Sequence, residues 1–148
     1  MCVLFLLIPY TLVFGNETEN AYLALETNKP SKDGPLVVSI GAFGVGSGKG
    51  THINLAYIEA RNKEKSVVLD LGVSVALKRS IFTIYVGGGG LVGYNGSREK
   101  LVRGYYPEAG ILIDITKKFG LIASGKRYIN LFSETEDVVM LGLLFGAR

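Results

Sequence analysis

The sequence predicts an all-β fold, namely an eight-stranded, antiparallel, up-and-down β-barrel that spans a membrane. Three observations support this prediction. Eight runs of alternating apolar residues follow one another along the chain, and the connections between them alternate between more polar and tighter ones. The residues between the aliphatic positions are mostly small or hydrogen-bonding. An up-and-down meander whose two ends lie in different environments has these properties.

The connections are the first observation. The seven joints are Asn28–Gly34, Gly46–Gly50, Arg61–Lys65, Lys78–Ser80, Asn95–Arg103, Lys117–Lys118 and Ser133–Asp137. The first, third, fifth and seventh are the more polar ones and include the two longest. The fourth and sixth are tight, and the second is mostly glycine although it is no shorter than the third. This asymmetry predicts short turns at one end of the barrel and longer loops at the other.

The chain before the barrel forms a separate zone. Residues 1–15 carry no charge and include a short, continuously apolar run, which predicts a signal peptide. The usual positively charged start is missing, so we expect this peptide to be truncated; the alternative is a buried N-terminal strand or helix. Residues 16–148 then form a single barrel domain. The only cysteine, Cys2, precedes the apolar run, so the mature protein is expected to lack a disulfide and a cysteine-based metal site.

The first three runs differ in clarity. The run Asn20–Thr27 is short and alternates weakly, so its assignment as strand one is the least secure of the eight. The second run lies between the first two joints. The third, Thr51–Ala60, places Ile53, Leu55 and Tyr57 on one face and small or polar residues on the other, as expected of a strand.

The fourth and fifth runs alternate most clearly. They are Ser66–Leu77 and Ile81–Tyr94. Their aliphatic or aromatic faces consist of Val67, Leu69, Leu71, Val73 and Val75, and of Phe82, Ile84, Val86, Val92 and Tyr94. Small residues dominate the opposite faces. Helical spacing explains neither run.

The last three runs are Gly104–Thr116, Phe119–Phe132 and Val138–Ala147. The first and third of them again alternate regularly. The middle one holds Lys126 and Arg127, and strict alternation would turn Arg127 towards lipid. A β-bulge that shifts the register by one residue would restore the pattern.

The two faces predict which side meets the membrane. A face of Gly, Ser, Ala, Asn and Tyr suits a narrow barrel interior, so the aliphatic face is expected to contact lipid. Four charged residues on the mixed face or near it are then candidates for a buried polar network: Asp70, Glu108, Asp114 and Lys126. The alternative is that they are solvent-facing charges of a soluble barrel. Aromatic residues near the strand ends favour membrane interfaces: Tyr57, Phe82, Tyr94, Tyr105 and Phe145.

Two glycine-rich stretches match nucleotide-binding patterns only superficially. Gly88–Gly93 fits the dinucleotide fingerprint, but a turn follows it where the fingerprint requires a helix. Gly44–Thr51 resembles a phosphate-binding loop, but Phe43 and Gly50 occupy two defining positions. We therefore predict no cofactor. The net charge of +3 is small and the basic residues are scattered, which argues against nucleic-acid binding.

His52 is the only histidine, which excludes a metal site built on two histidines. It could serve an acyl-transfer reaction with Ser47, Ser74 or Ser124, but the sequence selects none of them. Asp70, Glu108 and Asp114 could also act as paired catalytic carboxylates, although structural ion pairs are the favoured interpretation. We predict no catalytic residue and no metal site.

Three stretches carry a resemblance to a known family. Ile81–Asn95 leads from an aliphatic-aromatic run through glycines into a loop, Arg103–Ile111 contains a Glu-x-Gly, and Val139–Phe145 is similar to a closing strand. In these stretches the chain resembles the small outer-membrane β-barrel family, which includes opacity proteins and OmpA-like barrel domains. The family's closing strand usually stops on a terminal aromatic residue that the barrel assembly machinery recognises, whereas this chain continues with residues 146–148.

The resemblance implies a monomeric barrel in the outer membrane of a Gram-negative bacterium, with lipids, lipopolysaccharide and the assembly machinery as partners. At eight strands, side chains fill the interior, so a diffusion porin is not expected. The leading hypothesis is a non-enzymatic protein with a structural or surface role, or one that binds lipid or a small ligand. Two alternatives stay open: a lipid-modifying barrel enzyme, and a soluble lipocalin-like barrel.

Overall fold

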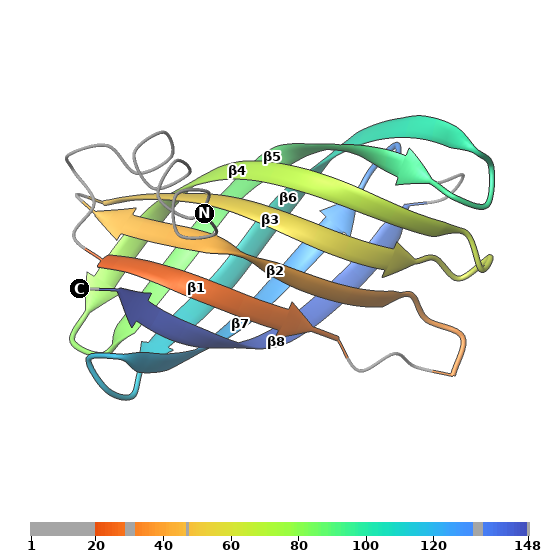
Figure 1. The fold of residues 1–148 in the computed structure, drawn as a ribbon. Helices are drawn as coiled ribbons and strands as arrows, with labels where there is room; N and C mark the ends of the chain where they lie inside the picture. Colours follow the sequence, from red (N-terminus) through yellow and green to blue (C-terminus); the bar gives the residue numbers. More distant parts are fainter. Residues whose placement is uncertain (1–19, 29–31, 47, 132–134, 148) are drawn as a thin grey trace, which may run out of the picture.

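The computed structural model describes residues 20–28, 32–46, 48–131 and 135–147. In this part of the chain, eight antiparallel strands form one closed barrel in sequence order, and β1 pairs with β8 to close it (Figure 1). The strands are β1 (Asn20–Thr27), β2 (Leu36–Gly46), β3 (Lys49–Glu59), β4 (Lys65–Arg79), β5 (Phe82–Asn95), β6 (Lys100–Asp114), β7 (Phe119–Tyr128) and β8 (Glu136–Ala147). The predicted all-β, eight-stranded, up-and-down architecture is confirmed.

The described part of the chain holds no helix with the length and apolar character needed to cross a membrane.

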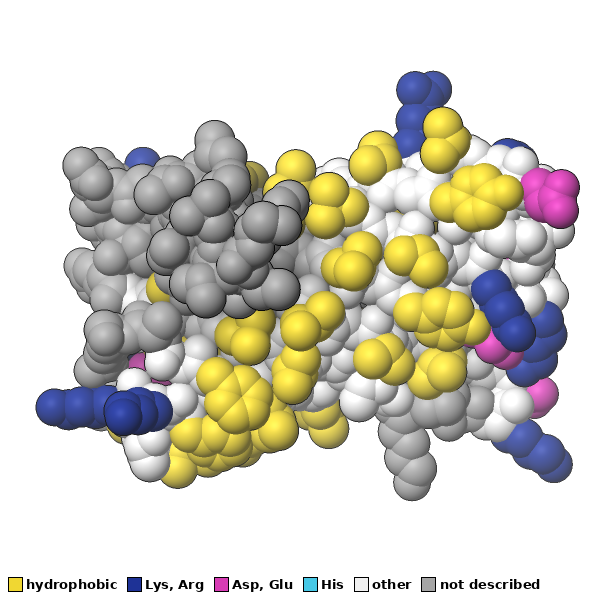
Figure 2. Space-filling view, in the orientation of Figure 1, with side chains coloured by type: hydrophobic (Ala, Val, Ile, Leu, Met, Phe, Trp, Pro, Cys, Tyr) yellow, Lys and Arg dark blue, Asp and Glu magenta, His cyan; other side chains and the backbone are white. Residues whose placement is uncertain are grey.

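The aliphatic faces point out of the barrel, as predicted. Leu69 and Leu71 are 42% and 52% exposed, whereas Asp70 between them is 1% exposed. The same holds for most outward positions around the barrel, and Figure 2 shows the resulting apolar band between charged ends. A soluble barrel would enclose its aliphatic residues, so this arrangement contradicts the lipocalin-like alternative.

The predicted aromatic residues also lie on the outer face. Tyr57, Tyr94 and Tyr105 are exposed towards the end with the longer loops, and Phe82 and Phe145 towards the end with the short turns. Aromatic rings favour the two membrane–water interfaces, so their positions mark both edges of the apolar band.

Three expectations about the connections need correction. The loop predicted at Asn95–Arg103 is only residues 96–99, because the β5–β6 ladder continues to the pair Asn95↔Lys100. This loop is therefore no longer than the β6–β7 turn, residues 115–118. Strand β7 ends at Tyr128, well before residue 132.

A β-bulge, which would have restored the alternation near Arg127, is absent from the described strands. The β7–β8 register runs without a shift from Phe119↔Phe145 to Tyr128↔Glu136. Arg127 does point outward, but it lies near the end of its strand and forms an ion pair with Asp137 across the ladder, with Nε 2.6 Å from Oδ1. The partner and the position at the rim let a charged residue face outward without a bulge.

Two apolar clusters fill the barrel interior at different depths. The first lies towards the loop end and includes Ile58, Val68, Leu91, Tyr128 and Met140. The second lies towards the short turns and includes Phe43, Val45, Tyr85, Leu112 and Leu144. The side chains of an eight-stranded barrel are sufficient to fill its lumen. The polar residues of the interior therefore lie between two packed layers.

The loop end is tied together by Glu64, which lies in the β3–β4 loop. Its carboxylate accepts hydrogen bonds from Asn62 Nδ2 at 2.7 Å and from Asn95 Nδ2 at 2.9 Å, and it pairs with the Arg98 guanidinium. Burial opposes ionisation of Glu64, but these hydrogen bonds and the positive charge outweigh it and lower the pKa of the carboxyl below its usual 4.5.

We expect this loop junction to stabilise the barrel in a pH-dependent manner. A lowered pKa in the folded state stabilises the protein above the ordinary pKa of the group, and the stabilisation is lost as the pH falls through the lowered value. Glu64→Gln should therefore reduce stability at neutral pH, and the difference from wild type should vanish in strong acid. Urea unfolding of both proteins across this pH range tests the prediction; a difference that is independent of pH would contradict it.

Candidate functional site

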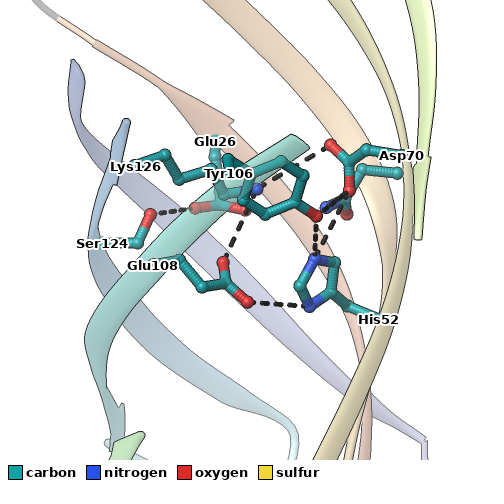
Figure 3. Close-up of polar contacts among 8 residues, drawn as sticks. Glu26, His52, Asp70, Tyr106, Glu108, Ser124 and Lys126 are labelled. Carbon is teal, nitrogen blue, oxygen red and sulfur yellow. Dashed lines mark hydrogen bonds and ion pairs between the residues drawn. The ribbon is translucent and has the colours of Figure 1, made fainter. Parts of the chain in front are cut away.

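The polar residues of the interior meet in one cluster at mid-depth. Alternation along β3, β4, β6 and β7 turns His52, Asp70, Tyr106, Glu108 and Lys126 into the lumen, where all are buried. The register brings them to one level, since Glu108 pairs directly with Lys126. Figure 3 shows their side chains converging from opposite walls of the barrel. We call these five residues the lumen cluster.

Asp70 is the most highly connected member. Its Oδ1 accepts a hydrogen bond from Tyr106 at 2.9 Å and one from Asn54 Nδ2 at 3.0 Å, and it lies 3.4 Å from His52 Nε2. Its Oδ2 lies 3.8 Å from Lys126 Nζ. A buried carboxylate needs partners of this kind to compensate for the loss of hydration.

His52 connects Asp70 to Glu108. Its Nε2 lies 2.7 Å from the Tyr106 hydroxyl. Because Tyr106 donates its own proton to Asp70, Nε2 must be the donor to Tyr106. The other ring nitrogen, Nδ1, lies 3.2 Å from Glu108 Oε1. The imidazole therefore lies between the two carboxylates of the lumen cluster, with one ring nitrogen near each.

Lys126 provides the charge that balances the carboxylates. Its Nζ lies 3.8 Å from Asp70 Oδ2 and 3.8 Å from Glu108 Oε2, and it stands 4.9 Å from the centre of the Tyr106 ring. Neither oxygen of Glu108 accepts a hydrogen bond from the described residues, so nearby charge is what holds this carboxylate. Lys126 is the common partner of two acids and an aromatic face.

A third acid lies beside the lumen cluster, and it was not among the predicted candidates. Glu26 of β1 is buried and accepts a hydrogen bond from Ser124 at 2.9 Å (Figure 3). Apolar and polar residues alternate only weakly along β1, which explains why sequence reasoning missed Glu26. Three acids, Glu26, Asp70 and Glu108, therefore lie buried in the interior together with the amine of Lys126.

The structure brings three of the four predicted network residues together: Asp70, Glu108 and Lys126. Asp114 is the exception and does not join them. It is half-buried near the short turns, where it accepts a hydrogen bond from the Tyr22 hydroxyl at 2.8 Å and lies 3.7 Å from Lys78 Nζ. It therefore belongs to a separate contact at the rim of the barrel.

The geometry gives little support to the acyl-transfer hypothesis. Within the described residues, no serine contacts His52, because the imidazole is occupied by Tyr106, Asp70 and Glu108. Ser124 donates its hydrogen bond to Glu26 instead, and Ser47 lies outside the described residues. The described residues therefore do not form the Ser–His pair that acyl transfer would need. What the lumen cluster does supply is a set of compensated charges that ties four strands together.

No protein-family model matches the sequence, and no curated protein is significantly similar to it. Solved structures do match the fold. A de novo designed transmembrane β-barrel is 16% identical, with a TM-score of 0.64, and the match covers 89% of this chain and 98% of that one. The N-terminal β-barrel domain of Pseudomonas aeruginosa OprF is 15% identical, with a TM-score of 0.63, and the match covers 89% and 100%.

Neisserial surface protein A (NspA) is a third similar structure. It is 13% identical, with a TM-score of 0.54, and the match covers 86% of this chain and 92% of that one. At such identities the likeness concerns the fold. The closed eight-stranded barrel agrees with these structures, so the chain has the fold of the small, eight-stranded outer-membrane β-barrels.

Proposed function

We propose that this protein is a monomeric outer-membrane barrel of a Gram-negative bacterium, that it has no enzymatic activity, and that it acts through the surface it presents at the membrane. The observation that carries the proposal is the filled lumen. The lumen cluster lies between two packed apolar layers, and His52 is committed to three partners inside the protein. An interior of this kind offers neither a wide aqueous path nor an accessible catalytic group.

The outer surface is then the part of the molecule that can meet partners. The apolar band contacts lipid acyl chains, and the longer loops lie beyond one edge of it. We expect the outer-leaflet lipids, including lipopolysaccharide, to be its partners there, and the barrel assembly machinery to insert it. A structural or surface-binding role follows from this placement.

Three measurements on one expression strain test the proposal. The protein should fractionate with the outer membrane and migrate faster on gels before boiling than after it. Vesicles that contain it should release a small-sugar reporter no faster than empty vesicles do. Lipid A from cells with wild-type protein, with His52→Ala and with empty vector should have the same acyl chains. Rapid sugar release, or an acyl change that depends on His52, would overturn the proposal.

A further inference from the structure

The end of the barrel that carries the short turns is strongly basic. The described residues there include five basic side chains and a single acid, Asp114: the basic ones are Lys49, Lys78, Arg79, Lys117 and Lys118. Lys78 lies 3.7 Å from Asp114. The other four are exposed, and none has an acidic partner within the described residues. Glu17, Glu19 and Arg148 lie outside those residues.

The opposite end of the barrel has a smaller excess of positive charge, because its described residues include eight basic side chains and six acids. Four of its basic residues form ion pairs with acids at that end: Arg61 with Glu136, Lys63 with Glu59, Arg98 with Glu64, and Arg127 with Asp137. The two ends therefore differ in degree. Half of the described basic residues at the loop end have acidic partners there, whereas four of the five at the short-turn end have none within the described residues.

These four cations begin where the apolar band stops. Arg79 pairs in register with Phe82, which is exposed to the outside. Lys117 and Lys118 lie between exposed Ile115 and half-buried Phe119. Figure 2 shows basic side chains projecting beyond the apolar band at this end. Long basic side chains next to interfacial aromatic residues lie at the depth of lipid headgroups.

We propose that Lys49, Arg79, Lys117 and Lys118, the basic rim, bind the anionic headgroups of glycerophospholipids in the leaflet at the short-turn end. The cations stand in or beside all three short turns, so they are spread over several sides of the rim instead of forming one patch. Headgroup phosphates and a net negative lipid charge supply the partners that the described residues lack. This inference rests on the membrane-spanning fold and is independent of the proposed surface role at the loop end.

Spin-labelled lipids provide a direct test with the intact, folded protein. Wild-type barrel is reconstituted in phosphatidylcholine vesicles that contain a trace of spin-labelled phosphatidylglycerol or spin-labelled phosphatidylcholine. The fraction of label immobilised at the protein is measured for each. We expect the immobilised fraction of spin-labelled phosphatidylglycerol to be roughly twice that of spin-labelled phosphatidylcholine. This ratio is an average over both leaflets, and only the leaflet that contains the basic rim selects the anionic lipid. High salt should abolish the preference.

Matched variants locate the effect. Arg79→Gln/Lys117→Gln/Lys118→Gln should lose the preference, whereas Lys32→Gln/Lys63→Gln/Lys65→Gln, which removes the same charge from the loop end, should keep it. All substituted residues are exposed, and a heat-shift gel confirms that each variant is folded. No preference in the wild-type protein, or equal losses in the two variants, would overturn the inference. The sugar-release and lipid A measurements do not depend on lipid selectivity at the basic rim. A failure of this inference can therefore be distinguished from a failure of the proposed function.

Discussion

Replacing Lys126 with methionine is expected to destabilise the barrel by about 3–5 kcal/mol, because it leaves buried carboxylates without their counter-charge. Methionine keeps the length and the unbranched shape of lysine, so the packing changes little. Asp70 and Glu108 would each lose a partner at 3.8 Å. Urea unfolding in lipid vesicles measures the loss.

Two further variants show whether the charge is the cause. Lys118→Met removes a cation from the exposed rim and should change stability by less than about 0.5 kcal/mol. Adding Glu108→Gln to Lys126→Met should recover part of the lost stability, because it removes one of the unpaired charges. If Lys126→Met were as mild as Lys118→Met, the lumen cluster would not be the stabilising feature described above.

The second large effect is expected at Gly72, where an added methyl group has no room. Gly72 of β4 pairs in register with His52 of β3, and a Cβ there would lie 2.2 Å from His52 Cε1. The imidazole cannot move aside easily, because it stacks on Phe43 and is hydrogen-bonded to Tyr106. Gly72→Ala should therefore cost about 1–3 kcal/mol or more.

Gly90→Ala is a matched control in the neighbouring strand. A Cβ at Gly90 would point outward, and its nearest neighbour would be Gly104 O at 4.0 Å, which is an ordinary contact distance. We expect this variant to unfold within about 1 kcal/mol of wild type. The combination Gly72→Ala/His52→Ala should be less destabilised than the sum of its parts, since the clash is removed. Equal effects of Gly72→Ala and Gly90→Ala would contradict the account.

Alternation alone was enough to predict which side chains enter the barrel. Side chains in a strand point to opposite faces in turn, so Leu69 and Leu71 had to share a face that Asp70 does not. The chemistry of the two faces then decided the environment. Small and hydrogen-bonding residues such as Gly72 and Ser74 suit a crowded lumen better than a water-exposed surface.

The depth of each residue along the barrel could not be predicted in the same way. Asp114 lies on the mixed face of its strand, as Glu108 does, but the register places it at the rim beside Tyr22 and Lys78. Register depends on how each strand pairs with its neighbours, and a single sequence does not show it. The contact between His52 and Tyr106 depends on the same unseen pairing.

The ends of the strands were also difficult to predict, for a related reason. Near the rim both faces of a strand meet water, so polarity no longer distinguishes strand from loop. Residues 100–103 are strand although they resemble a loop in composition. An outward-facing Arg127 was unexpected because the sequence does not show its partner. The ion pair with Asp137 can be inferred only when the register of β7 and β8 is known.

The most direct test of the central claim is whether the aliphatic stripes touch lipid. The chain contains no tryptophan, so a single introduced tryptophan reports on one position. Leu71→Trp on the outer face and Tyr85→Trp in the interior are compared in vesicles whose lipids carry brominated acyl chains, which quench tryptophan fluorescence on contact. The structure predicts strong quenching of the tryptophan at position 71 and weak quenching at position 85. Stronger quenching at position 85, or a water-exposed emission spectrum at position 71, would contradict the assignment of the two faces.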